Sequence, residues 1–185
     1  MRILCHICCA QCFLGVAEML DEKDKHLEGF FYNPNIHPLI EFRKRLKSVK
    51  VLRDRLKFRL HAVEDYGLKS FIAMTAFREE PQTRCPLCYR QRLFETARFA
   101  AENGFDAFTT TLLVSQHQQH KAIARAGQEA AEFAGVDFFY RDFRANAAKA
   151  HDEAKHMNLH LQSYCGCVFS EYERYANTIK ELYKG

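Results

Sequence analysis

Short apolar runs alternate with longer amphipathic stretches along this 185-residue chain, and this alternation limits the folds open to it. Short runs rich in β-branched and aromatic residues are typical of strands, whereas apolar residues three and four positions apart are typical of helices. Strands are expected at residues 2–5, 27–32, 58–63, 107–111 and 136–140. Helices are expected at residues 12–20, 38–56, 67–77, 117–133, 145–157 and 169–183, with one more that follows Cys88 and runs to about residue 102.

Strands that are separated by helices pair in parallel. The sequence therefore predicts an α/β fold with a mostly parallel, doubly wound, Rossmann-like sheet that is flanked by helices, with further helices at the C-terminus. The length suits one domain, and four Pro and eight Gly leave no room for a long linker, so residues 1–185 are expected to form a single domain. Ligands bind beyond the carboxyl ends of such strands, where residues 8–12 and 112–116 are expected to lie.

Composition excludes several classes of protein. Hydrophobic residues are 48% and charged residues 27% of the chain, which argues against wholesale disorder. No apolar run approaches the roughly 18 residues of a membrane span. His6, Gln11 and Glu18 interrupt the apolar N-terminus, which we interpret as mature protein rather than a signal peptide. A cytoplasmic protein without a membrane partner is expected.

The cysteines are the chemically informative residues. Eight are present, at positions 5, 8, 9, 12, 85, 88, 165 and 167. Two C-x-x-C pairs have the spacing that brings two thiolates to one metal centre, and a C-x-C group follows later. Four thiolates suit structural zinc or an iron–sulfur cluster, and seven clustered thiols exceed one four-ligand site. Cys5 lies in an apolar run and is expected in the core; the alternative for the extra cysteines is the same burial as small apolar side chains.

Basic residues are concentrated in one predicted helix and the residues just after it: nine of the 27 Lys and Arg residues lie between positions 43 and 59. Such a run is usually a solvated face. Its density also suits a surface that binds phosphates, which Arg residues near the second C-x-x-C pair would extend. The expected nucleic-acid-binding set is Arg43, Lys44, Arg45, Lys47, Lys50, Arg84 and Arg92.

Five longer motifs occur in order along nearly the whole chain. They are HxCCAxC from His6, FYNPNIHP from Phe31 with Glu41 and Arg45 behind it, RCxxCY from Arg84 with Arg92-Leu93, TTTLLVS from Thr109, and YCGCxFSE from Tyr164. Together they resemble the cobalamin-independent epoxyqueuosine reductases, which act at the last step of queuosine synthesis in tRNA. The sequence departs from that pattern at Gln11, where Pro is usual, and at Gln116-His117, where Pro and an aromatic residue are usual.

The resemblance implies a [4Fe-4S] cluster with a second, adjacent iron. It also implies two-electron reduction of the epoxide of epoxyqueuosine, at the wobble position of tRNA, to the cyclopentene of queuosine. An electron donor of unknown identity would supply the electrons. From spacing alone, we assign the pairs Cys9, Cys12, Cys85 and Cys88 to the cluster, which leaves Cys8, Cys165 and Cys167 for the second iron.

Four polar residues near expected strand ends are candidate proton donors or substrate ligands: His6, Asn33, Asn35 and His37. The alternatives are turn formation for the two asparagines and a hydrogen-bonded core position for His6.

Two other functions use the same residues. An iron–sulfur enzyme that transfers sulfur to tRNA would need a Gly-rich phosphate loop after the first strand, and residues 8–12 contain no Gly. The other alternative is an RNA-binding module without catalytic activity, in which the cysteines hold a structural zinc ion.

Overall fold

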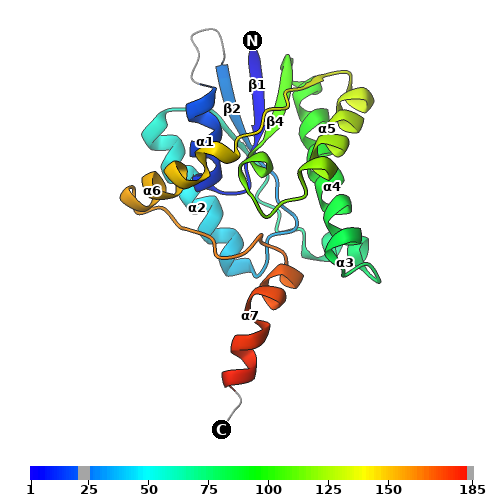
Figure 1. Ribbon diagram of the computed structural model, residues 1–185. Helices are drawn as coiled ribbons and strands as arrows, with labels where there is room; N and C mark the ends of the chain where they lie inside the picture. Colours follow the sequence, from blue (N-terminus) through cyan, green and yellow to red (C-terminus); the bar gives the residue numbers. More distant parts are fainter. Residues whose placement is uncertain (21–25, 183–185) are drawn as a thin grey trace.

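The sheet confirms the predicted doubly wound architecture. The computed structural model describes residues 1–20 and 26–182, and within them five parallel strands form one sheet in the order β3-β2-β1-β4-β5 (Figure 1). The strands are β1 (Arg2–His6), β2 (His26–Phe31), β3 (Leu60–Ala62), β4 (Ala107–Thr110) and β5 (Asp137–Phe138). The strand order reverses between β1 and β4, and a crevice forms at the carboxyl ends of the strands at such a reversal.

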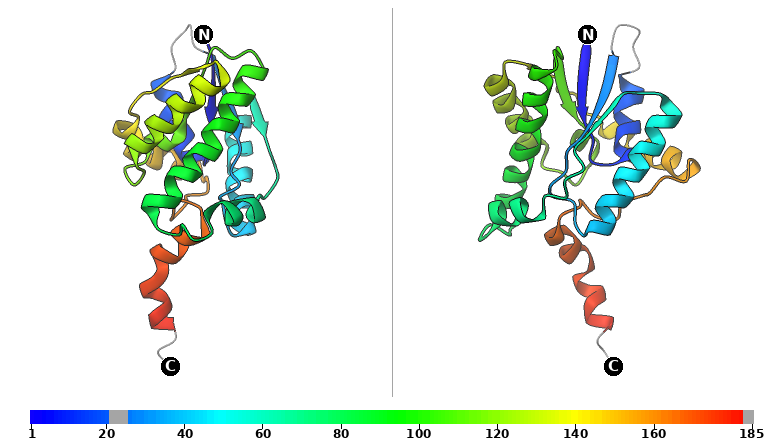
Figure 2. Two further views of the ribbon diagram at one scale, coloured as in Figure 1. Left: turned by 90° about the vertical axis from the view of Figure 1, so that its right-hand side faces the viewer. Right: turned by 180° about the vertical axis from the view of Figure 1, so that it is seen from behind.

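Helices cover both faces of the sheet. They are α1 (Ala10–Met19), α2 (Leu39–Leu56), α3 (Leu68–Thr75), α4 (Pro81–Glu102), α5 (His120–Ala134), α6 (Ala147–His156) and α7 (Val168–Leu182), with 3-10 turns at Thr111–Val114 and Arg144–Asn146. Right-handed crossovers place α1 and α2 on one face, and α4 and α5 on the other. The helix α6 packs on α1 (Figures 1 and 2).

The core lies on both sides of the central strand β1. In this strand Ile3, Leu4 and Cys5 have no exposed surface, because helices cover both faces of the sheet. The prediction that Cys5 is a core residue is therefore confirmed. The chain leaves β1 at its carboxyl end and enters α1 within a few residues, which fixes Cys8 and Cys9 at the crevice.

The helix α4 begins earlier than the sequence pattern indicates. The helix expected to follow Cys88 instead starts at Pro81 and includes the second C-x-x-C pair. Pro81 occupies the first helical turn, where a missing N–H costs no hydrogen bond. Pro86 lies inside the helix, where it removes one hydrogen bond to the Gln82 carbonyl, but the helix continues through it. Both Cys85 and Cys88 consequently lie on the helix.

The last described helix, α7, projects away from the body below the sheet (Figures 1 and 2). It runs from Val168 to Leu182, close to the predicted 169–183, of which residue 183 lies outside the described residues. Among residues 1–20 and 26–182, no helix combines the length and the apolar character needed to cross a membrane.

Candidate metal centre

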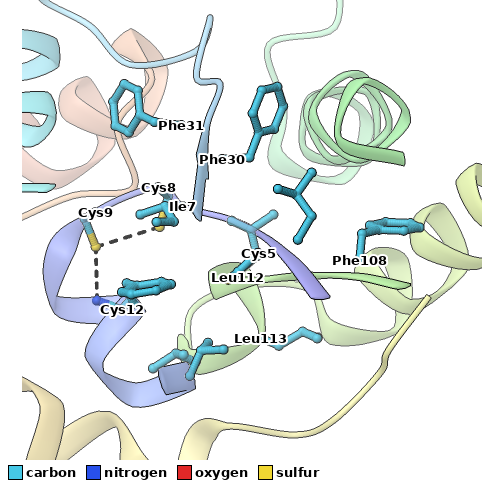
Figure 3. Close-up of a cluster of buried hydrophobic side chains, with 14 of the residues drawn as sticks. Cys5, Ile7, Cys8, Cys9, Cys12, Phe30, Phe31, Phe108, Leu112 and Leu113 are labelled. Atoms are coloured by element: carbon cyan, nitrogen blue, oxygen red, sulfur yellow. Dashed lines mark hydrogen bonds between the residues drawn. The ribbon is translucent and has the colours of Figure 1, made fainter. Parts of the chain in front are cut away.

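Three thiols meet at the N-terminus of α1. The Sγ atoms of Cys8, Cys9 and Cys12, here called the thiol trio, all lie within 4.8 Å of one another (Figure 3). Cys9 caps the helix: its Sγ accepts a hydrogen bond from the Cys12 N–H at 3.4 Å and lies 3.8 Å from the Sγ of Cys8. Free N–H groups and the positive end of the helix dipole favour negative charge at this position. The trio is thus suited to thiolates.

Cys8 is tied to the loop that follows β4. Its N–H donates to Thr111 Oγ1 at 3.0 Å, and the Thr111 hydroxyl donates back to Cys8 Sγ at 3.2 Å. Hydrogen bonds from the Cys12 and Cys9 thiols, aided by Thr111, hold the pKa of Cys8 well below its usual range. The same contact with Cys8 raises the pKa of Cys12, and burial raises that of Cys9. Negative charge in the trio therefore concentrates on Cys8.

The other four thiols line a small cavity to which the thiol trio does not contribute. Cys85 and Cys88 come from α4, Cys165 and Cys167 come from the segment before α7, and all four line this cavity, here called the four-thiol pocket. Burial, followed by the neighbouring Cys165, raises the pKa of Cys85 to about 11. Burial also raises the pKa of Cys88 to about 12. Burial thus keeps Cys85 and Cys88 protonated at neutral pH, and a metal ion that binds them has to displace their protons.

Arg45 holds the segment that carries Cys165. Its side chain is 1% exposed, and it donates to the carbonyls of Cys165 and Tyr164 at 2.9 Å each and to Glu41 Oε1 at 2.6 Å. Gly166 has φ = +134°, a conformation that side chains rarely adopt, and a Cβ there would lie 3.1 Å from Ile36 and 3.2 Å from Arg45. Gly166 therefore allows a tight turn of the chain between Cys165 and Cys167.

Cys167 caps α7 as Cys9 caps α1. The Ser170 N–H donates to Cys167 Sγ at 3.4 Å, and the Ser170 hydroxyl donates to the Cys167 carbonyl at 2.8 Å. Both groups of thiols thus contain one cysteine at the start of a helix.

A larger cavity of about 630 Å³ joins the two groups. Members of both line it: Cys8, Cys12, Cys85, Cys165 and Cys167. Two glutamines in its wall reach the thiols. Gln118 donates to Cys165 Sγ at 3.4 Å while accepting from the Tyr89 hydroxyl at 2.8 Å, and Gln162 donates to Cys12 Sγ at 3.7 Å. The volume lies within the range of small-molecule sites.

Comparison with known proteins identifies the family. A family model described as "Epoxyqueuosine reductase QueH" matches residues 3–173. The chain belongs to the QueH family. Epoxyqueuosine reductase QueH of Dehalococcoides mccartyi is 33% identical over 174 residues, covering 94% of each chain. The same-named protein of Thermotoga maritima is 33% identical over 180 residues, covering 93% of this chain and 91% of that one. The chain is accordingly an oxidoreductase of this family, and the resemblance found in the sequence is confirmed.

One solved structure is also similar in outline. It is the U34-tRNA thiolase NcsA from Methanococcus maripaludis with its [4Fe-4S] cluster, with 12% identity and a TM-score of 0.49, covering 100% of this chain and 67% of that chain.

The four residues expected to donate protons or bind substrate in this QueH-family chain occupy different environments. His6 is buried, its Nδ1 paired with Thr110 Oγ1 at 2.9 Å and its Nε2 with the Tyr32 carbonyl at 3.2 Å. Burial, and then the charge of Arg92, lower its pKa to about 3. A neutral ring with both nitrogens bonded favours the core alternative for His6. The Asn33 side chain donates to the Ile7 carbonyl at 2.8 Å, which favours its turn-forming alternative.

His37 and Asn35 lie nearer the thiols. The His37 N–H donates to the Gly166 carbonyl at 2.7 Å, its ring packs against Tyr66 and Phe71, and burial lowers its pKa to about 4. Asn35 has no exposed surface and lines the four-thiol pocket, and neither polar atom of its side chain has a partner among the described residues. A buried amide without partners is costly unless something binds it, so Asn35 is the strongest of the four candidates.

The expected nucleic-acid-binding set divides in two. Arg43, Lys44 and Lys47 are exposed on α2, and Lys50 pairs with Glu64 at 2.5 Å. Arg45, Arg84 and Arg92 are buried, with at most 3% of each residue exposed, which corrects their placement on a docking surface. They lie on the inner faces of α2 and α4. The sequence pattern showed that these positions carry charge but not that they are buried. Arg84 pairs with Glu173 of α7 at 2.7 Å.

Two residues at the centre carry no sequence signal of their own. Gln118 and Gln162 reach the thiols from loops whose placement depends on the fold. Thr111, which also reaches a thiol, belongs to the TTTLLVS motif. One signal was available: Arg84, Cys88 and Arg92 are spaced four apart and share one helix face once α4 begins at Pro81.

Proposed function

We propose that this chain reduces the epoxide of epoxyqueuosine in tRNA to the cyclopentene of queuosine, with a [4Fe-4S] cluster and an adjacent iron held by its seven clustered thiols. Family membership supports the reaction. The observation that carries the metal centre is the meeting of three separate cysteine motifs around one cavity of about 630 Å³.

The donor set fits such a centre. Thiolates are the ligands of iron–sulfur clusters, and the sulfurs here come in one group of three and one group of four. Two thiolates on one tetrahedral ion, with metal–sulfur bonds of about 2.3 Å, lie about 3.8 Å apart. The Cys8 and Cys9 sulfurs have this separation of 3.8 Å. Thiolates of a four-iron cluster bind different irons and therefore lie farther apart.

These distances support a different partition from the one based on spacing. We infer that the four-thiol pocket holds the cluster and that the thiol trio holds the second iron with one ligand position open to the cavity. The earlier partition places Cys9 and Cys12 with Cys85 and Cys88, and it stays the competing prediction.

Reduction of the epoxide to the alkene consumes two electrons and two protons and releases water. The metal centre, when bound, would pass the electrons from the reductant to the substrate. The protein's own part is to bind and orient the substrate beside the thiols. Five glutamines in the cavity wall offer neutral donors and acceptors to hydroxyl groups and base edges: Gln11, Gln116, Gln118, Gln119 and Gln162. Gln118 and Gln162 at the same time orient thiols in the two groups.

The test is metal and sulfide analysis of anaerobically purified protein, together with conversion of epoxyqueuosine-containing tRNA. We expect acid-labile sulfide, more iron than four atoms per chain, and queuosine as product once a reductant is added. Stoichiometric zinc without sulfide would instead support an RNA-binding module, and a product that gains sulfur would support sulfur transfer.

Single Ser variants distinguish the two partitions. Under the regrouping, Cys165→Ser and Cys88→Ser both lose the cluster absorbance, whereas Cys12→Ser keeps it and loses the extra iron. Loss of the cluster in Cys12→Ser with retention in Cys165→Ser would support the partition based on spacing. Cys5→Ser, in the core and outside both groups, is the control for a change that affects folding alone.

A further inference from the structure

Arg92 is a buried cation without a visible counter-ion. It lies on α4 with 1% of the residue exposed, and its Nε donates to the Cys88 carbonyl at 3.4 Å. Neither Nη1 nor Nη2 has a hydrogen-bond partner among the described residues. A guanidinium carries five N–H donors, so most of its capacity is directed at something other than the described protein atoms.

The other two buried arginines each have a carboxylate partner, which Arg92 lacks among the described residues. Arg45 pairs with Glu41 at 2.6 Å, and Arg84 pairs with Glu173 at 2.7 Å. No carboxylate in residues 1–20 and 26–182 forms such a pair with Arg92. An uncompensated charge in a protein interior is strongly unfavourable, so an anion must accompany Arg92 in the functional state.

The surroundings of Arg92 point to that anion. Its side chain lines the four-thiol pocket. The same pocket is lined by all four thiols of this group, Cys85, Cys88, Cys165 and Cys167. Arg92 thus lies beside the thiols that would hold a bound centre.

We propose that Arg92 is the resident counter-ion of the metal centre, a positioning residue whose fixed charge stabilises the bound thiolates and makes the centre easier to reduce. This inference rests on the proposed function, since it requires a thiolate-bound centre. Reduction adds one negative charge, and a buried positive charge in the lining of the same pocket stabilises the reduced state more than the oxidised state. Hydrogen bonds from Nη1 and Nη2 to sulfur would act in the same direction.

The experiment compares Arg92→Leu, Arg92→Met and Arg92→Lys with the wild type after anaerobic reconstitution. Spectroelectrochemical titration measures the midpoint potential of the centre. We expect Leu and Met to shift the reduction equilibrium by about tenfold toward the oxidised state, which is 59 mV for a one-electron couple. Lys, which keeps the charge, should recover most of this shift. Arg98→Leu is the matched control, because Arg98 lies on the same helix but is exposed and paired with Glu95 and Glu102.

A second measurement separates this role from a merely structural one. Thermal melting is followed for metal-free and metal-loaded protein. Arg92→Leu should lower the melting temperature of the loaded form while leaving the metal-free form unchanged or more stable, because it removes an uncompensated charge from the latter. A structural role would lower the melting temperature of both forms.

The outcomes distinguish this inference from the proposed function. A wild-type protein that binds neither iron nor sulfide overturns the proposed function. A loaded Arg92→Leu protein with wild-type potential, or one whose two forms are equally destabilised, overturns the inference alone. If Leu and Met both fail to retain the centre while Lys retains it, the inference is supported.

Discussion

Glu41 compensates the buried charge of Arg45 and, through it, steadies the segment that carries Cys165. Burial would raise the pKa of Glu41, but Arg45 and His160 outweigh it and hold the pKa below its usual range. Glu41 Oε2 also lies 2.9 Å from His160 Nε2. Glu41→Gln keeps the shape and removes the charge, so it should reduce the free energy of unfolding by about 3 kcal/mol at pH 7.

This effect depends on pH with a definite sign. A carboxylate whose pKa is depressed in the folded state contributes stability above its unfolded pKa of about 4.3, and the contribution is lost as pH falls through the folded value. The difference between wild type and Glu41→Gln should therefore shrink below about pH 4. Urea unfolding of both proteins from pH 7 to pH 3.5 checks this, since effects common to both proteins cancel. A difference that stays constant with pH would contradict the charge-based explanation.

Gly166 is the second residue whose role can be tested alone. Gly166→Ala forces a side chain into φ = +134° and against Ile36 and Arg45, so it should cost about 1–3 kcal/mol and displace Cys165 and Cys167. We expect less iron and sulfide per chain as well as lower stability. Gly135→Ala is the matched control: Gly135 also has positive φ, at +68°, but a Cβ there meets nothing within 4 Å. It should lower stability without lowering metal content.

The exposed basic residues of α2 that lie nearest the cavity are in its first turns. Arg45, which lines the cavity, lies beside Arg43, Lys44 and Lys47 on this helix. The opposite end of α2 lies about 20 Å away at 1.5 Å per residue. A triple Ala variant of Arg43, Lys44 and Lys47 should raise the KM for tRNA and reduce the salt dependence of binding by up to about one unit per lost phosphate contact. Iron content should not change.

The control for this prediction removes three charges at the other end of the helix and just beyond it, from Arg55, Lys57 and Arg59. The control variant combines Arg55→Ala, Lys57→Asn and Arg59→Ala. Asn is chosen at position 57 because it tolerates the left-handed backbone conformation of that residue. This variant has the same net charge as the first and should bind tRNA as the wild type does. Equal losses in filter-binding or kinetic measurements of both variants would show that only the overall charge matters, and no loss in either would place the docking surface elsewhere.

The element α4 shows what a sequence pattern can and cannot give. Its apolar stripe predicts the helix after Cys88, but Pro86 and the polar residues before it indicate a loop. The helix nevertheless starts at Pro81, because tertiary contacts such as the Arg84–Glu173 pair hold its first turns. Because the sequence does not reveal those contacts, it predicts that Arg84 and Arg92 lie on the surface. In the structure both are buried and face the thiols.

For the whole molecule, the alternation of apolar runs was sufficient to predict the parallel sheet and the edge at which the site lies. It could not predict which thiols meet. Cys85 and Cys165 are 80 residues apart, and their approach depends on the Arg45 contacts and on the turn at Gly166. Spacing along the chain favoured pairing the two C-x-x-C motifs, whereas the structure brings the second of them to the C-x-C segment.

Metal removal should destabilise the molecule as a whole. A centre that binds the folded chain and ties β1, α4 and the C-terminal segment together contributes its binding free energy to folding. Anaerobic chelation should lower the melting temperature by several degrees and increase protease cleavage within residues 159–170. Melting curves with and without a chelator, followed by mass spectrometry of the fragments, measure both effects. Unchanged melting after complete iron removal would contradict a centre that stabilises the fold.

The order in which the ligands lie along the chain also has a consequence for biosynthesis. The thiol trio spans five residues next to the first strand, so it is complete as soon as β1, α1 and their neighbours have emerged from the ribosome. The four-thiol pocket also needs Cys165 and Cys167, which follow the trio by more than 150 residues. A chain that terminates before Tyr164 therefore has the trio but not the pocket. The complete centre can therefore assemble only after Cys167 has been synthesised, and it distinguishes chains that contain this segment from chains truncated before it.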